Sequence, residues 1–277
     1  MMLTWVKPFV VVNGFVYGLA LATCRAESWV GAWGSCLCRD VVIVLFLTWM
    51  TASKQRIRGP KKATCTTLEP WVRLAAIAAP VDAGVAILAR YLDLRSDEVS
   101  PTFGPLGFLY VSFGFEVIFD LFHYWTHRAC HSHPWLVKYH AVHHRHHAGL
   151  EPASTYDQAA LDVFVCNALP AMAALGVIVR AVGPLSRRDW SLLWTYKSYV
   201  EVAGHAGVHS RATSFPQCVW LPRVLGIALR TVDHDLHHSS RGRSGNYAKR
   251  FTLWDKLFGT YLPPVEEETR EMKWEMK

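Results

Sequence analysis

Long apolar windows alternate with polar segments along this chain of 277 residues. A helix that crosses a membrane needs roughly 20 mainly apolar residues. The windows that approach this length cover residues 5–24, 33–51, 71–92, 103–122, 160–182 and 188–204. Asp82 and Arg90 interrupt the third window and Glu116 the fourth, so we expect some of these helices to be tilted or packed against one another. The pattern predicts an all-α protein with four to six membrane spans.

The first window could also be a cleaved signal peptide. Lys7 would form its basic region, and the small residues Ala20 to Ala22 its cleavage site. Because further apolar windows follow, we interpret it as an uncleaved anchor.

Basic residues after the second window indicate how the chain lies in the membrane. Under the positive-inside rule this loop is cytoplasmic; it contains Lys54, Arg56, Arg58, Lys61 and Lys62. The third and fourth windows form one membrane hairpin, and the fifth and sixth form another. Each hairpin returns the chain to the same face, so the polar stretches 123–159 and 205–261 lie together there. Arg187 and Arg188 in the far-side turn argue against this orientation, but they are fewer.

Composition supports a membrane protein. Hydrophobic residues make up 51% of the chain and charged residues 18%. The formal net charge is +7, but the basic residues lie beside apolar windows, which favours a membrane surface over nucleic acid. Seven cysteines scattered from Cys24 to Cys218 show no disulfide or zinc-ribbon spacing and are interpreted as small buried hydrophobes.

The histidines are the strongest chemical signal. All fourteen lie between residues 123 and 238, and eleven of them fall in three groups. The first has the helical spacing i, i+4, i+8, and the other two contain the pattern H-x-x-H-H, whose outer members share a face of a helix. The groups are His123, His127, His131; His140, His143, His144, His146, His147; and His234, His237, His238.

So many histidines predict two metal ions. Imidazole suits zinc, copper, iron and nickel, so ligand type leaves the metal open. A structural zinc site closes with four ligands, whereas eight or nine histidines are enough for two ions. Ligating histidines usually donate their second N–H to an oxygen; the nearby carboxylates are Asp120, Glu201, Asp233, Asp235 and Asp255. The metal centre is expected to form a helical cap on the cytoplasmic face.

Around these histidines the sequence resembles the fatty acid hydroxylase and sterol desaturase superfamily, over about residues 115–262. The matching elements are Asp120, Tyr124-Trp125, His127-Arg128-Ala129-Cys130-His131, His140-Ala141-Val142-His143-His144, His234-Asp235-Leu236-His237-His238, Asn246-Tyr247, Trp254-Asp255 and Phe258-Gly259-Thr260. Arg128 selects His127 and His131 as the first box, and the eight residues between His131 and His140 select the second. The lone histidine of the family corresponds to His205, ahead of Gly207.

The resemblance implies two iron ions held by His127, His131, His140, His143, His144, His205, His234, His237 and His238. Asp120, Glu201, Asp235 and Asp255 would support these ligands. It also implies the endoplasmic reticulum, O2 as oxidant, and electrons from NAD(P)H through a reductase or a cytochrome b type carrier. The chain has no recognisable nucleotide or haem attachment motif, so the electron donor is expected to be external.

The substrate implied is a lipid. The ending Ser244-Gly245-Asn246-Tyr247 resembles sterol 4-methyl oxidases, whereas Tyr156-Asp157-Gln158 replaces a His-Pro that many members carry. Fatty acid or sphingoid-base hydroxylation and sterol desaturation remain alternatives on the same metal core. A membrane cytochrome, a zinc hydrolase and a non-enzymatic metal or scaffold protein are the rival classes. His123, His146, His147 and His209 receive no role.

The expected organisation has three parts. Residues 1–70 form membrane anchor segments and the basic loop, residues 71–262 the catalytic domain, and residues 263–277 a charged tail.

Overall fold

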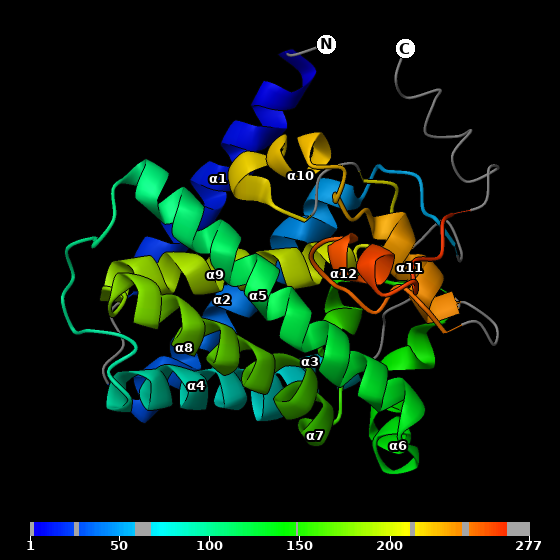
Figure 1. The fold of residues 1–277 in the computed structure, drawn as a ribbon, viewed down its shortest axis with the longest axis horizontal. Helices are drawn as coiled ribbons and strands as arrows, with labels where there is room; N and C mark the ends of the chain where they lie inside the picture. Colours follow the sequence, from blue (N-terminus) through cyan, green and yellow to red (C-terminus); the bar gives the residue numbers. More distant parts are fainter. Residues whose placement is uncertain are drawn as a thin grey trace.

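The structure is a computed structural model that describes residues 3–24, 28–58, 68–147, 149–210, 214–239 and 244–264. Within these ranges the regular secondary structure is helical, with only isolated bridges between extended residues (Figure 1). The all-α prediction is therefore confirmed. The predicted tail 263–277 and the basic residues Lys61 and Lys62 lie wholly or almost wholly outside the described residues.

Among the described residues, five helices are long and apolar enough to cross a membrane. They are α1 (Leu3–Thr23), α2 (Trp29–Thr51), the continuous helix Glu69–Tyr91, α5 (Pro105–Ser132) and the continuous helix Ala160–Val182. This number falls within the predicted four to six.

Two of these helices contain a π-helical turn next to a proline. The helix 69–91 joins α3 (Glu69–Arg73) to α4 (Ala79–Tyr91) through Leu74–Ala78, and the helix 160–182 joins α7 (Ala160–Val163) to α8 (Leu169–Val182) through Phe164–Ala168. Pro80 and Pro170 stand at the start of α4 and α8. Proline lacks an N–H and crowds the preceding turn, and a wider turn relieves this strain.

The sixth predicted window is a helix but not a candidate span among the described residues. It forms α9 (Arg187–Gly204), which carries Arg187, Arg188, Asp189, Lys197 and Glu201, more charge than a membrane-crossing segment tolerates. Most of its side chains are buried, and it packs against α1 and α2. The helix lies among the other helices of the bundle (Figure 1).

Two apolar cores meet at α9. One core joins it to α4, α5 and α8 and contains Phe115, Leu175 and Trp194, which are almost completely buried. The other joins it to α1 and α2 around Ile43 and Tyr199. A helix with apolar partners on both sides can bury an amphipathic sequence, so its polar residues are enclosed as well.

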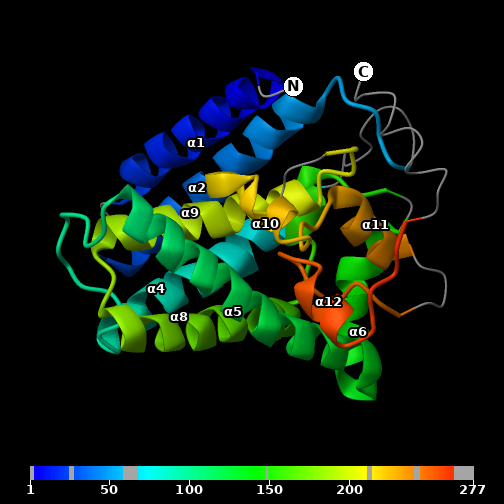
Figure 2. The ribbon, with the colours of Figure 1, turned by 45° about the horizontal axis from the view of Figure 1, so that its top comes forward.

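Short helices form a cap at one end of the bundle (Figure 2). They are α6 (Pro134–His143), α10 (Leu221–Val224), α11 (Thr231–Ser239), α12 (Leu253–Leu257) and the 3-10 turns His144–His146, Pro152–Tyr156 and Pro216–Cys218. The basic segment before residue 59 lies at this end, since the backbone N–H of Ile57 donates to the Gly207 carbonyl and Arg58 pairs with Asp235.

The opposite end holds the turns 92–104 and 183–186, where the Ser96 N–H donates to Leu185. Both histidine-bearing stretches thus lie at one end, as the hairpin argument requires. The side of the membrane that this end faces stays a prediction, as do the three proposed parts of the chain.

The cysteines only partly match their interpretation. All six in the described segments are free thiols; Cys36, Cys130 and Cys166 are buried, Cys24 and Cys218 are half-buried, and Cys38 is exposed.

Candidate metal centre

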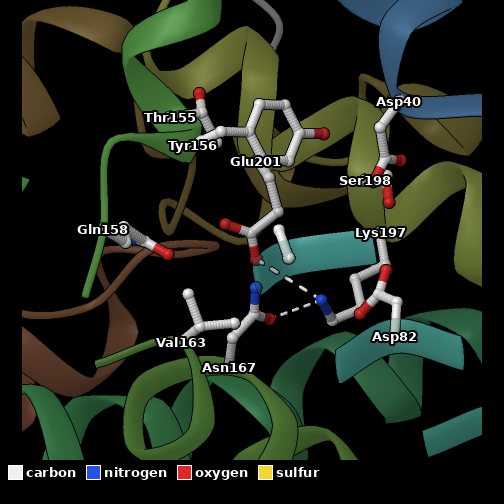
Figure 3. Close-up of a pocket in the computed structure, with 11 residues that line it drawn as sticks. Asp40, Asp82, Thr155, Tyr156, Gln158, Val163, Asn167, Lys197, Ser198 and Glu201 are labelled. Carbon is white, nitrogen blue, oxygen red and sulfur yellow. Dashed lines mark hydrogen bonds and ion pairs between the residues drawn. The ribbon is translucent and has the colours of Figure 1, made fainter. Parts of the chain in front are cut away.

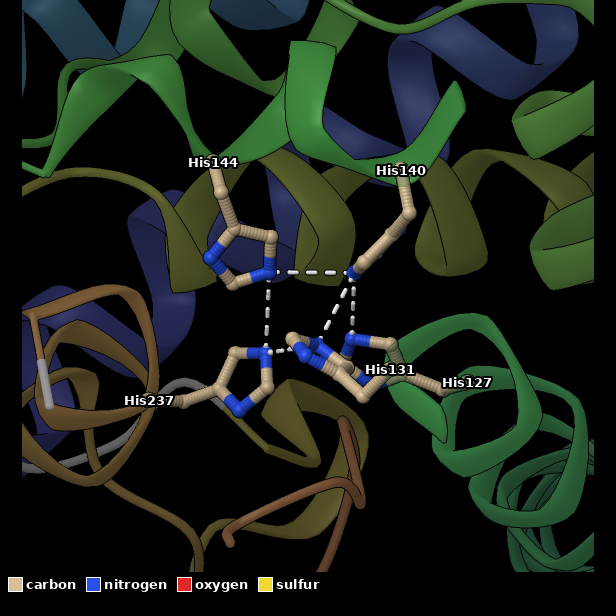
Figure 4. Close-up of side chains that lie close together, drawn as sticks. All are labelled: His127, His131, His140, His144 and His237. Carbon is tan, nitrogen blue, oxygen red and sulfur yellow. Dashed lines mark hydrogen bonds between the residues drawn. The ribbon is translucent and has the colours of Figure 1, made fainter. Parts of the chain in front are cut away.

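Nine histidine side chains gather into two clusters inside the cap. We call His127, His131, His140, His144 and His237 the first cluster, and His143, His205, His234 and His238 the second. In each cluster every residue offers one nitrogen within 4.8 Å of the others. Figure 4 shows the first cluster, with its rings directed toward a common centre from three separate parts of the chain. These are the nine histidines that the sequence selected.

Each H-x-x-H-H pattern divides its histidines between the clusters. His140 and His144 are one helical turn apart and enter the first cluster, whereas His143 points to the second. In α11 the division is reversed, with His234 and His238 in the second cluster and His237 in the first. The sequence pattern indicated which outer members share a face, but not that the remaining histidine serves the neighbouring cluster.

Oxygen acceptors fix the orientation of four rings. The Nδ1–H of His127 donates to the Tyr247 carbonyl at 2.7 Å, and that of His237 to the Gly245 carbonyl at 2.7 Å. His205 donates to the Glu201 carbonyl at 2.8 Å. The fourth ring, His140, donates to the carboxylate of Asp162 at 2.8 Å. Because these oxygens only accept, each Nδ1 carries the proton and each Nε2 presents a lone pair.

The lone pairs converge at close range. The Nε2 atoms of His127 and His140 are 3.1 Å apart, and both belong to rings whose proton is on Nδ1. His131 and His144 approach His140 to 3.0 Å each. Two facing lone pairs repel, so this arrangement calls for a cation between them.

The second cluster has the same character. His205 Nε2 lies 3.2 Å from His143 Nε2 and 3.1 Å from His234 Nε2. Both ring nitrogens of His238 are buried and make no hydrogen bond within the described residues. Buried nitrogens without partners are costly, and a metal ion would satisfy the one that faces the cluster.

Burial keeps these imidazoles neutral. Loss of solvation, followed by repulsion from neighbouring imidazoles, holds the pKa of His143, His234, His237 and His238 well below the usual value. The pKa of His205 falls to about 3, mainly through burial. Neutral imidazole is the form that binds metal.

A close backbone approach helps to place two of the rings. Gly245, whose carbonyl holds His237, has space only for a hydrogen, because a Cβ there would lie 2.6 Å from the Thr260 carbonyl oxygen. Gly207, two residues after His205, has φ of 65°, and a Cβ would lie 1.9 Å from the Leu150 carbonyl. Its tight turn leaves α9 directly after His205.

Two of the predicted supporting carboxylates hold a loop rather than a ring. Asp120 accepts the backbone N–H groups of Lys249, Arg250 and Phe251 at 2.7, 2.8 and 3.0 Å. Asp255 accepts the N–H of Tyr247, whose carbonyl receives His127. Both residues therefore act on the loop 247–251, one step removed from the histidines.

Glu201 and Asp235 contact cations. The backbone carbonyl of Glu201, rather than its carboxylate, accepts from His205. Its carboxylate pairs with Arg250 at 2.7 Å and with Lys249. Asp235 pairs with Arg58, tying the basic segment to α11. Asp233 bonds with Arg230 at the start of α11.

Asp162 is the supporting residue that the sequence analysis missed. Its side chain is fully buried and accepts from His140. The signal was an ionisable residue inside an apolar window, which is rare without a function. A further grouping with metal-ligand spacing joins Asp162 and His140 to Cys130 and Cys166, whose sulfurs are 3.4 Å apart.

The remaining histidines lie outside the two clusters. His123 donates Nδ1–H to the Cys166 carbonyl at 2.6 Å, His146 pairs with Asp157 at 2.7 Å, and His147 is exposed. The backbone N–H of His209 donates to the Gln55 carbonyl. The structure thus separates His123 from the stripe that it shares with His127 and His131.

A polar cavity is lined by residues of α2, α4, α9 and the turn Pro152–Tyr156 (Figure 3). Glu201, which supports His205, and Val163, next to Asp162, are among its lining residues. Lys197 enters it from α9, donates to Asn167 and lies 3.8 Å from Glu201. These polar groups are enclosed among membrane helices and satisfy one another, as buried charges must.

Comparisons with known proteins agree with this site. A fatty acid hydroxylase of Lecanicillium sp is 32% identical over 156 residues, which are 55% of this chain and 42% of that protein. A methylsterol monooxygenase of Aspergillus fumigatus is 31% identical over 168 residues, 59% of this chain and 50% of that protein. A sphingolipid C4-hydroxylase of Schizosaccharomyces pombe is 28% identical over 191 residues, 65% and 59% respectively.

The chain therefore spans about half the length of the curated relatives it matches. No solved structure matches it significantly. The sequence profile of the fatty acid hydroxylase family matches residues 113–260, more than half of the chain and all nine clustered histidines. By this match, the chain belongs to the fatty acid hydroxylase family.

Proposed function

We propose that this protein is a membrane-bound, non-haem di-iron oxygenase that oxidises a lipid. The observation that carries the proposal is the convergence of bare Nε2 atoms, above all His127 and His140 at 3.1 Å, in rings whose tautomers are fixed by oxygen acceptors. Nine imidazoles in two adjacent clusters fit two cations better than any hydrogen-bonded arrangement.

Each cluster would hold one ion. The first offers five nitrogens and the second four, and neither contains a cysteine or the general-base glutamate of an H-E-x-x-H zinc hydrolase. Imidazole suits iron as well as zinc or copper. Membership of the family favours iron.

The protein's own groups would prepare the site. The carbonyls of Tyr247, Gly245 and Glu201 and the carboxylate of Asp162 hold the ligand rings in one tautomer, which reduces the reorganisation needed on binding. Bound iron would supply O2 activation for the oxidation of a C–H bond. The burial of the clusters excludes water that would quench such chemistry. Hydroxylation by O2 also releases water and consumes an external pair of electrons, so a carrier protein or reductase is required.

The substrate proposed is a sterol bearing an oxidisable methyl group. The segment 244–247 supports this choice by its resemblance to sterol 4-methyl oxidases, and one relative is named a methylsterol monooxygenase. Another relative is named a sphingolipid C4-hydroxylase, and the same clusters would serve an acyl or sphingoid chain. We place the protein in the endoplasmic reticulum, with the cap facing the cytoplasm.

Metal analysis of the purified full chain, combined with an absorption spectrum, tests the proposal. We expect about two irons per chain, one for each cluster, and no Soret band. Lipid profiles of cells with and without the gene, grown with isotopically labelled O2, should show label in one lipid class. Bound haem, a single zinc, or the absence of label from every lipid would refute the proposed oxygenase activity. Label in a sphingoid base would refute only the proposal that the substrate is a sterol.

A further inference from the structure

A second cleft lies at the end of the bundle opposite the metal centre. It encloses about 440 Å³, counting its open mouth, and is lined by the end of α1, the start of α2, α4, α9 and the turn after α4. In Figure 1 this end is at the left, where the segment 92–104 loops between α4 and α5.

Positive charge predominates around this cleft. Arg95 and Arg187 line it. Both approach the carboxylate of Asp97, at 4.0 and 3.5 Å, which Arg90 already contacts at 2.6 Å. Three guanidinium groups therefore share one carboxylate, and that carboxylate is half exposed to solvent.

One of the arginines that line the cleft, Arg95, has too little negative charge around it. About 90% of the Arg95 side chain is buried. Burial lowers the pKa of Arg95, and the charges of Arg187 and Arg90 lower it further, against the opposing effect of Asp97. A buried cation is costly unless an anion pairs with it closely, and Asp97, at 4.0 Å, is shared with two other arginines.

Two hydrogen-bond donors in the cleft have no acceptor within the described residues. These two, which do not include the Nε of Arg187, are Nε of Arg95 and Nε1 of Trp194, and both are buried. The third arginine of the lining, Arg39, is satisfied by Asp40 and Asp82. These donors therefore favour an acceptor that carries negative charge. Water would accept their hydrogen bonds but would leave the positive charge of the arginines unbalanced.

The surroundings of the cleft are those of a membrane boundary. It lies where candidate spans end, between Thr23 of α1 and the residues just beyond α4. Trp190 and Trp194 stack with ring centroids 4.1 Å apart and form one wall.

We propose that this cleft binds the phosphate of an anionic phospholipid, with Arg95, Arg187 and Trp194 as its donors. Arginine matches phosphate geometry with two parallel N–H donors. The bound lipid would join α1, α2, α4 and α9 at the end farthest from the metal centre. The site does not depend on the catalytic proposal.

Native mass spectrometry of the detergent-solubilised full chain tests this site, with phosphatidylglycerol and phosphatidylcholine of equal acyl chains as probes. Wild-type protein should retain one phosphatidylglycerol in preference to phosphatidylcholine. Arg95→Gln should weaken that binding about tenfold, the value of one charge-assisted hydrogen bond. Arg180→Gln is the matched control, because it removes the same charge from an exposed position near the end of α8.

Trp194→Phe is a second variant, which keeps an aromatic ring but removes the N–H donor. It too should weaken the retention of phosphatidylglycerol. Both variants should keep wild-type metal content, because the cleft is remote from the cap. Equal retention of the two lipids would overturn the proposal, as would an equal loss in Arg180→Gln. If inorganic phosphate displaced phosphatidylglycerol at equal concentration, the cleft would be a site for a soluble anion, and the proposal of a bound lipid would be overturned.

Discussion

Asp162 offers the sharpest test of how the metal centre is held. His127, His205 and His237 are oriented by backbone carbonyls, which a side-chain substitution leaves in place, whereas His140 is oriented by a carboxylate. Replacing Asp162 with alanine leaves a buried Nδ1–H without its acceptor at 2.8 Å. It also frees the ring to turn its Nε2 away from the first cluster.

The magnitude follows from the character of this hydrogen bond. A bond to a charged group contributes about 1.5–3 kcal/mol. Loss of a supporting carboxylate typically weakens metal binding by about 10–100-fold, an equivalent range. Both members of the pair are almost fully buried, so solvent screening does not reduce this value. We expect iron affinity in Asp162→Ala to fall by about one to two orders of magnitude.

Iron affinity is measured by competition with a chelator on the purified full chain, together with turnover at matched protein levels. Asp162→Asn keeps an oxygen acceptor and should recover part of the affinity. Asp157→Asn is the control, because Asp157 contacts His146, which lies outside both clusters. Wild-type iron affinity in Asp162→Ala would refute the reasoning; a lowered unfolding temperature with unchanged affinity would make Asp162 merely structural.

Three further predictions concern other parts of the molecule. Alanine at His127 or His205 should remove bound metal, measured per chain, whereas alanine at His123 or His209 should not; full metal in His205→Ala would remove that residue from the ligand set. Arg250→Met should lower stability by about 3–5 kcal/mol in thermal unfolding, because it leaves Glu116 and Glu201 as buried charges without this partner; an unchanged midpoint would contradict this. Epitopes inserted at Lys54 and Pro263 should be accessible from the same side of the membrane and one at Val99 from the other; opposite sides for Lys54 and Pro263 would exclude a site on one face.

Much of the metal centre could be predicted because its information is local. The spacing within H-x-x-H-H places its outer histidines one helical turn apart, and a turn of helix keeps them together in the fold. His140 and His144 illustrate this. Arg128, which follows His127, likewise indicated that His127 and not His123 belongs to the first histidine box. In the structure the ring of His123 donates to the Cys166 carbonyl instead.

The parts that could not be predicted depend on long-range packing. No spacing indicates that Gly245 or Tyr247 would present a carbonyl to a ring, because every residue carries one. Asp162 received no role within the window 160–182, since its partner lies 22 residues away on another helix. The window 188–204 was taken for a span because composition does not tell burial in protein from burial in lipid.

The charge around the clusters explains how such a site can serve oxidation chemistry. The ligand imidazoles are neutral, so ions held by them keep their own positive charge. Asp162 is the carboxylate that touches a clustered ring, and Glu201 is already paired with Lys249 and Arg250. In a buried site this positive field is weakly screened. With ions bound, this positive field would favour the arrival of electrons and of negatively charged oxygen species. A ligand set rich in carboxylates would add negative charge and oppose their arrival.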